Sequence, residues 1–129
     1  MKIHHIGYLV KNMDRAIKEF SRLGFCGKEV VRDEYRGIDI CFMDNDGYCV
    51  ELISPYRDDS TVSGLIKKYN NSPYHLCYIS NNLEKDVEEL AQTGYIQIGE
   101  PKEAPAIDGR RVVFMMNRSV GMIEIVEGE

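Results

Sequence analysis

Hydrophobic and polar positions follow the same order twice along this chain. An apolar stretch at 3–10 is followed by apolar residues at helical spacing, and an apolar stretch at 74–79 is followed by the same pattern. The helical positions of the two copies are Met13, Ile17 and Phe20, and Leu83, Val87 and Leu90. The pattern therefore predicts a strand followed by a helix in each half of the chain.

The two copies also share individual residues. With His5 aligned to His75, they match without a gap as far as Phe25 and Tyr95. The identical pairs are His5 and His75, Tyr8 and Tyr78, Asn12 and Asn82, Glu19 and Glu89, and Gly24 and Gly94. A match of this length without a gap indicates two copies of one module.

Capping residues define both helices. Asn12 and Asn82 each precede the helical pattern, where a side-chain oxygen accepts an otherwise unpaired backbone N–H of the first turn. Gly24 and Gly94 follow it, where a residue in the left-handed conformation ends a helix.

Three further strands are expected after each helix. They lie at 28–34, 38–43 and 48–53 in the first half, and at 95–98, 111–117 and 121–126 in the second. Asp44-Asn45-Asp46-Gly47 joins two of these strands and is a strong hairpin signal. Each module is therefore expected to run strand, helix, strand, strand, strand.

This order predicts an α+β fold in one domain, residues 1–129, made of two tandem βαβββ modules. The modules span 1–54 and 73–127, and a linker at 55–72 holds a turn, a helix cap at Ser60 and a short helix near 61–69. A module with one helix cannot cover its own sheet, so the two sheets are expected to meet edge to edge or face to face. Repeated modules of this kind tend to form a site where they meet.

Composition narrows the classes of partner. The chain has 129 residues, 43% hydrophobic and 29% charged, with a net charge of −5, which argues against nucleic acid as the partner. No apolar run approaches the roughly 20 residues of a membrane span, and the N-terminus does not resemble a signal peptide. The four cysteines form no CxxC pair. These features predict a reduced protein in the cytoplasm.

Two histidines and two glutamates are the candidate chemical residues. His5 and His75 lie on matching first strands, and Glu51 and Glu124 lie within the apolar runs YCVELIS and MIEIV of matching last strands. A carboxylate in such a run needs a partner, because burying it alone is costly. Singly, a strand histidine is more often a core residue and a strand glutamate often faces solvent. Together the four form a complete ligand set for a divalent cation of the zinc, nickel, cobalt, manganese or iron type.

Neighbouring residues refine this expectation. His4 is adjacent to His5 on a strand, so it is expected to face away from the site and to serve as a control. Cys49 and Cys77 lie two residues from Glu51 and His75, so they either line the pocket or are small core residues.

The stretches HHIGYLV, VELISP, YHLCYI and MIEIVE resemble the vicinal oxygen chelate superfamily across essentially the whole chain. That superfamily includes glyoxalase I (lactoylglutathione lyase), methylmalonyl-CoA epimerase, ring-cleaving dioxygenases, fosfomycin-modifying enzymes and metal-free antibiotic-binding proteins. The resemblance implies paired βαβββ modules whose sheets curl around a metal such as nickel, zinc, cobalt or manganese. Its ligand positions fall on His5, Glu51, His75 and Glu124, and it also implies a homodimer.

In the isomerase members of the superfamily, a carboxylate removes a proton from carbon next to a carbonyl while the metal acts as a Lewis acid. Glu124 and Glu51 are the candidate bases. The His/Glu/His/Glu shell is similar to that of glyoxalase I, so conversion of a thiohemiacetal to a thioester is the first expectation. A dioxygenase uses two histidines and one glutamate, and a binding protein on this scaffold usually lacks the ligands, so both are less favoured.

Epimerisation of a 2-methyl thioester is the second expectation. PYRDDSTVSGLIKKY and GRRVVFMMNRS resemble the linker and the penultimate strand of methylmalonyl-CoA epimerases. Two features depart from that branch. Its second glutamate aligns with Tyr35, with Glu34 expected on the opposite strand face, and Met116-Asn117-Arg118-Ser119 replaces its His-Pro-Lys-Ser turn.

Substrate contacts are the least defined part of the sequence. The loop near 103–111, EAPAIDGRR, is a candidate for closing over the pocket. Arg110, Arg111 and Arg118 are either solvated loop charges or partners for a carboxylate or phosphate of a thiol carrier.

Overall fold

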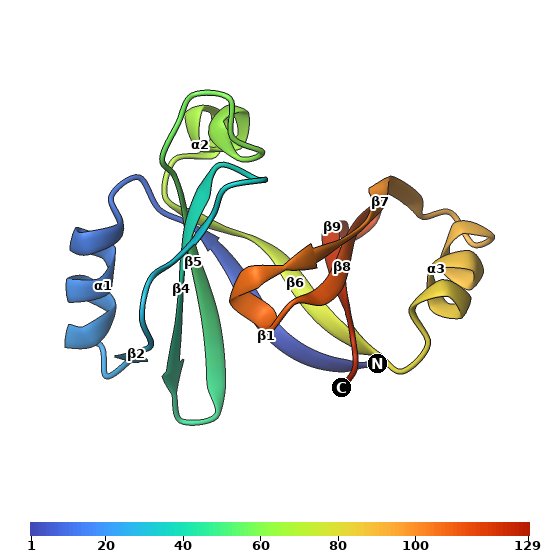
Figure 1. Cartoon of the computed structure of the whole chain (residues 1–129), viewed down its shortest axis with the longest axis horizontal. Coiled ribbons are helices and arrows are strands. Elements are labelled where there is room, and N and C mark those ends of the chain that lie inside the picture. The colour runs from blue at the N-terminus through green and yellow to red at the C-terminus, as the bar shows by residue number, and fades with distance from the viewer. The chain divides into compact units, whose positions relative to one another are not determined.

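The computed structural model describes residues 1–129 and contains nine strands, three α-helices and one 3-10 turn (Figure 1). In chain order these are β1 (Lys2–Leu9), α1 (Met13–Arg22), β2 (Cys26–Gly27), β3 (Val31–Asp33), β4 (Ile38–Asn45), β5 (Tyr48–Pro55), α2 (Ser63–Tyr69), β6 (Ser72–Ser80), α3 (Leu83–Ala91), β7 (Ile96–Ala104), η1 (Pro105–Ile107), β8 (Arg110–Asn117) and β9 (Gly121–Glu127). None of the helices is long and apolar enough to cross a membrane.

The chain divides into two compact units. His5–Tyr74 forms one, called here the N-unit, and Met1–His4 together with His75–Glu129 forms the other, called the C-unit. Division of the chain into modules at 1–54 and 73–127 stays a prediction.

In the N-unit the strands lie in the order β2-β4-β5-β1, with β3 also pairing with β4. The neighbours β4 and β5 form an antiparallel hairpin, whereas β5 and β1 run parallel, with Ile6 opposite Val50. The hairpin turns at Asp46 and Gly47, both with positive φ (50° and 83°). This confirms the hairpin expected from Asp44-Asn45-Asp46-Gly47.

The C-unit repeats this topology. Its strands lie in the order β6-β9-β8-β7, with β6 and β9 parallel and the other neighbours antiparallel. Leu76 lies opposite Ile123, as Ile6 lies opposite Val50 in the N-unit. Each half of the chain therefore follows the strand, helix and three-strand order that the repeat predicts, although the first of those three strands is short and interrupted in the N-unit.

The expected helix signals are confirmed in both units. The side chain of Asn12 accepts the backbone N–H of Arg15 at 2.9 Å, and that of Asn82 accepts the N–H of Lys85 at 3.2 Å. Gly24 and Gly94 have the same positive φ, 99°, after their helices. Such a value is rare for a residue with a Cβ, so glycine is the residue that ends each helix here.

Each helix covers one face of its own sheet. The apolar side of α1 packs on a buried cluster that includes Val50 and Leu52 of β5, and α3 packs on a cluster that includes Ile123 and Ile125 of β9. Because strand side chains alternate, the residue between each pair points to the other face of the sheet. Those two residues are Glu51 and Glu124.

One expected strand of the N-unit differs from the prediction. The strand expected at 28–34 is replaced by the short β2 and β3, and residues 34–37 form a turn. Asp33, almost completely buried, stabilises the turn that follows β3, because its carboxylate accepts the backbone N–H of Arg36 at 3.0 Å and an N–H of the Arg36 guanidinium at 2.7 Å. Glu34 and Tyr35 are exposed in this turn, so the expectation that strand alternation separates them is wrong.

The linker helix and the second hairpin also differ in detail. The helix expected near 61–69 is present as α2, but Val62 is its N-cap and the expected cap at Ser60 is wrong. Instead, the Ser60 hydroxyl accepts the N–H of Val62 at 3.3 Å and forms a turn ahead of the helix. Strand β7 continues to Ala104, well past the expected end at 98, with an irregular register between Ile98 and Lys102.

The caps make a measurable contribution to stability. We expect Asn12→Ala to lower the free energy of unfolding by about 1 kcal/mol, because the N–H of Arg15 loses its acceptor. Urea denaturation followed by circular dichroism measures the difference. Asn12→Ser is the control, since serine also caps well, and equal losses for the two variants would argue against the capping role.

Candidate metal centre

A histidine and a glutamate meet within the N-unit. His5 is on β1 and Glu51 on the parallel neighbour β5, where Glu51 lies opposite Gly7, two residues beyond the histidine. Nε2 of His5 lies 3.4 Å from Oε1 of Glu51. Both residues are buried, with 1% and 4% of their surface exposed. Strand pairing alone thus brings the two donor atoms together on the sheet face that α1 does not cover.

The C-unit holds the equivalent pair. Nε2 of His75 on β6 lies 3.2 Å from Oε1 of Glu124 on β9, and both residues are buried. Glu124 lies opposite Cys77, again two residues beyond the histidine. The two units therefore build the same pair with the same register.

The chemistry of each pair fits a divalent cation. A buried carboxylate needs a compensating positive charge or hydrogen bonds, and an imidazole nitrogen and a carboxylate oxygen are common ligands of zinc, nickel, cobalt and manganese. In each unit both donor atoms are buried within contact distance of each other. Each pair is thus a candidate metal-binding pair within its own unit.

A phenylalanine accompanies each pair and was not anticipated from the sequence. Phe42 of β4 lies directly opposite Glu51, and Phe114 of β8 directly opposite Glu124. Their rings meet His5 and His75 edge to face, with centroids 5.2 Å and 5.3 Å apart and interplanar angles of 77° and 87°. The signal was available in the sequence as FMDN at 42–45 and FMMN at 114–117, but it falls outside the segment that aligns without a gap.

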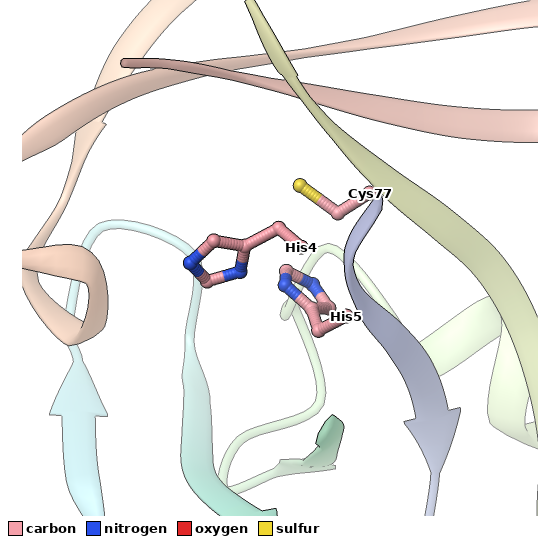
Figure 2. Close-up of side chains that lie close together, drawn as sticks. All are labelled: His4, His5 and Cys77. Atoms are coloured by element: carbon pink, nitrogen blue, oxygen red, sulfur yellow. The ribbon is translucent and has the colours of Figure 1, made fainter. Parts of the chain in front are cut away.

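The cysteines near the pairs differ in environment. Cys77 is fully buried on β6, and its sulfur lies within 4.8 Å of an imidazole nitrogen of His4 in the same unit. Figure 2 shows His4 and His5 at neighbouring positions of β1 and Cys77 on β6. Cys49 is half-buried, and burial, followed by its hydrogen bond with Asp44, raises its pKa to about 11. The protonated thiol of Cys49 is a poor metal ligand, because metals bind the thiolate.

His4 belongs to a hollow on the C-unit that contains neither glutamate of the pairs. This hollow has a volume of about 960 Å³ and includes Lys2, Lys85 and Arg110 in its lining. His4 therefore contributes to the lining of this hollow, and all the other lining residues also belong to the C-unit.

The arginines expected in a loop near 103–111 lie in ordered structure. Nε of Arg110 donates to the backbone oxygen of Glu127 at 2.7 Å. Arg111 forms ion pairs with Glu84 at 2.7 Å and with Glu127 at 2.9 Å. These contacts tie β8 to β9 and to α3, whereas Arg118 is exposed.

The segment itself is anchored. Ala104 at the end of β7 and Ile107 in η1 are both buried. The expectation that 103–111 is a loop is therefore wrong for most of its length, because β7, η1 and β8 occupy all but Asp108 and Gly109.

Comparison with known proteins identifies the family. Residues 4–114 match the Glyoxalase/Bleomycin resistance/Dioxygenase superfamily, and the chain belongs to this family. Its α+β fold is the fold of that superfamily, as the resemblance implied. The matched segment includes His5, Glu51 and His75, while Glu124 lies beyond it.

Individual relatives are distant in sequence and close in fold. The chain is 21% identical to the uncharacterised protein YqjC of Bacillus subtilis, with 98% of this chain and 91% of that protein covered. The crystal structure of hypothetical protein BH1468 from Bacillus halodurans superposes with a TM-score of 0.88 at 21% identity, covering 99% of this chain and 94% of that one. Methylmalonyl-CoA epimerase from Mycobacterium tuberculosis gives a TM-score of 0.87 at 20% identity, covering 99% and 88%.

The ion pairs of Arg111 predict a pH-dependent stability. Hydrogen bonds from Arg111 lower the pKa of Glu84 and of Glu127 below the ordinary value. A carboxyl whose pKa is lowered in the folded state stabilises the protein above its unfolded pKa, and this contribution disappears as the pH falls through the folded value. We therefore expect Arg111→Met to be less stable than wild type at pH 7, and the difference to shrink below about pH 4.3.

Urea denaturation at pH 7, 5 and 3 measures this difference. Arg118→Met removes the same charge from an exposed position and is the control. A gap between wild type and Arg111→Met that stays constant from pH 7 to 3 would contradict the linkage.

Proposed function

We propose that the two His/Glu pairs bind one divalent cation and that the protein is a metal-dependent isomerase acting on carbon next to a carbonyl. The ligands of this proposed site are His5, Glu51, His75 and Glu124. The observation that carries the proposal is the occurrence, in both units, of a buried imidazole and a buried carboxylate in contact.

The number of donors supports a shared ion. Each pair offers two protein ligands, whereas sites for zinc and related metals use three or four. Two pairs together supply four ligands of mixed nitrogen and oxygen type, a set that suits nickel, zinc, cobalt or manganese better than calcium or magnesium, which prefer oxygen ligands throughout. Six-coordinate metals of this group would retain open positions for substrate oxygens.

The chain's own residues would supply the proton transfer. The cation, when bound, would act as a Lewis acid toward a substrate carbonyl oxygen and so favour loss of the neighbouring proton. In conversion of a thiohemiacetal, Glu124 or Glu51 would take that proton as a general base and return it to the neighbouring carbon as a general acid. In epimerisation, one of the two glutamates would take the proton from one face of the carbon and the other would have to donate a proton to the opposite face.

Two substrates suit this chemistry, each supported by a different observation. The similarity in fold to methylmalonyl-CoA epimerase supports epimerisation of a 2-methyl thioester. The His/Glu/His/Glu composition, similar to that of glyoxalase I, supports conversion of a thiohemiacetal to a thioester. The second glutamate of the epimerases would align with the exposed turn at 34–37, and this position argues against epimerisation. A binding or resistance protein on the same fold is the alternative outside catalysis, and a cytoplasmic homodimer stays a prediction.

Removal of any one proposed ligand should reduce the amount of metal that the protein retains. We expect alanine substitution of His5, Glu51, His75 or Glu124 to reduce nickel or zinc content from one ion per chain to well below it, because each variant removes one of the four donors and so weakens retention of the ion. Metal analysis after chelation, reloading and gel filtration measures the content.

His4→Ala and Cys77→Ala are the controls for this experiment. Full metal content in both controls is expected. Loss of metal in these two variants together with full content in Glu51→Ala and Glu124→Ala would overturn the proposed ligand set.

Activity separates the two substrates. We expect the chelated protein, reloaded in turn with nickel, cobalt, zinc and manganese, to turn over either the hemithioacetal of methylglyoxal with glutathione or a chiral 2-methyl-malonyl thioester, and to lose activity when the metal is removed. Thioester absorbance follows the first reaction, and circular dichroism or proton exchange follows the second. Metal-bound protein that is inactive on both substrates would move the substrate outside these classes and favour a binding role.

A further inference from the structure

We propose that Phe42 and Phe114 are positioning residues that hold the imidazole rings of His5 and His75 in the orientation needed for metal binding. This inference rests on the proposed metal site. It concerns residues that the repeat alignment does not reach and that carry no donor atom of their own.

The phenyl rings are placed to restrict the imidazoles. In the N-unit, Phe42 lies directly across the antiparallel β4–β5 pair from Glu51, so both side chains project from the same face as His5. The phenyl and imidazole rings meet at 77° with centroids 5.2 Å apart, within the usual range for edge-to-face aromatic contacts. Rotation of the imidazole about its bond to Cβ would lose this contact and turn Nε2 away from the Glu51 carboxylate, 3.4 Å away.

The C-unit shows the same arrangement independently. Phe114 lies directly across the β8–β9 pair from Glu124 and meets the His75 ring at 87°, with centroids 5.3 Å apart. Nε2 of His75 lies 3.2 Å from the Glu124 carboxylate. Both modules keep the phenylalanine, its register and a nearly perpendicular ring contact, whereas most other core positions exchange one apolar residue for another.

A four-residue pattern explains how each strand positions its phenylalanine beside the His/Glu pair. In the sequences FMDN and FMMN, the methionine after each phenylalanine is fully buried in the core beneath the helix of its unit. The asparagine at the end donates its side-chain N–H to a backbone oxygen just after that helix, Asn45 to Leu23 at 3.2 Å and Asn117 to Gly94 at 3.3 Å. The strand is thus fixed to the helix on one side, which sets the phenylalanine against the His/Glu pair on the other.

Residues that orient metal ligands raise the affinity of a site for its metal by a measurable factor. Loss of such a partner typically weakens metal binding by 10- to 100-fold without removing a ligand, because the donor group then samples unproductive orientations. We expect Phe42→Leu and Phe114→Leu each to weaken nickel and zinc binding by about 10- to 100-fold, with the stoichiometry still one ion per chain.

The experiment is a competition titration of the chelated, full-length variants against a chromophoric chelator, at a temperature where thermal denaturation shows every variant folded. Phe20→Leu is the matched control, because Phe20 makes edge-to-face contacts with Tyr8 and Phe25 at 5.2 Å and 5.3 Å on the helix side of the same unit. It should lose stability and keep wild-type affinity. Phe42→Tyr keeps the ring and should restore the affinity that Phe42→Leu loses.

Imidazole ¹⁵N spectra of the metal-free protein supply a second readout. The His5 signals should shift in Phe42→Leu and the His75 signals in Phe114→Leu, each without the other. Wild-type affinity in both leucine variants, or equal weakening by Phe20→Leu, would overturn the positioning role while leaving the metal site intact. Full metal content in His5→Ala would instead contradict the proposed site itself.

Discussion

Alternation of side chains along β5 and β9 determines both the packing of the core and the position of the two buried glutamates. In each strand the residues flanking the glutamate pack beneath a helix, so the glutamate itself has to face the opposite side of the sheet. A carboxylate buried there needs a partner, and the parallel neighbouring strand supplies an imidazole at 3.4 Å or 3.2 Å. A register slip of one residue would expose the core and bury the glutamate beneath the helix, so packing and chemistry select the same strand pairing.

Duplication of the module places the same buried His/Glu pair in both halves of the chain. One unit alone provides a histidine and a glutamate beside a phenylalanine, and two donors are fewer than the three or four protein ligands of zinc and related sites. The second unit repeats all three with the same register and ring geometry. Divergence between the copies is concentrated elsewhere: the C-unit has the ion pairs of Arg111, whereas the N-unit has the Asp33 turn. The two copies therefore share the residues around the buried His/Glu pair as well as their helix caps.

The element types were predictable because they depend on local periodicity and on the repeat. The repeat also pointed to His5, Glu51, His75 and Glu124, which the structure places in two buried pairs, while their role as ligands stays a prediction. The helix caps at Asn12 and Asn82 are local signals, and both are confirmed. The interruption at 28–30 between β2 and β3 was not predicted, since the β-branched Val30 and Val31 favour a continuous strand. The extension of β7 past 98 was missed because Pro101 and its charged neighbours are typical of loops, whereas an edge strand with an irregular register tolerates them.

The phenylalanines of FMDN and FMMN illustrate a kind of contact that the sequence alone does not predict. Phe42 and Phe114 are apolar residues in apolar strands, so periodicity assigns them to the interior without saying what they touch. Only the cross-strand register shows that each lies opposite a glutamate and beside a histidine. An apolar side chain next to a polar pair affects chemistry through orientation and exclusion of water, and neither effect leaves a motif of donor atoms. In a duplicated fold, repetition of such a residue at equivalent structural positions is the evidence that its contact, beyond its hydrophobicity, has been retained.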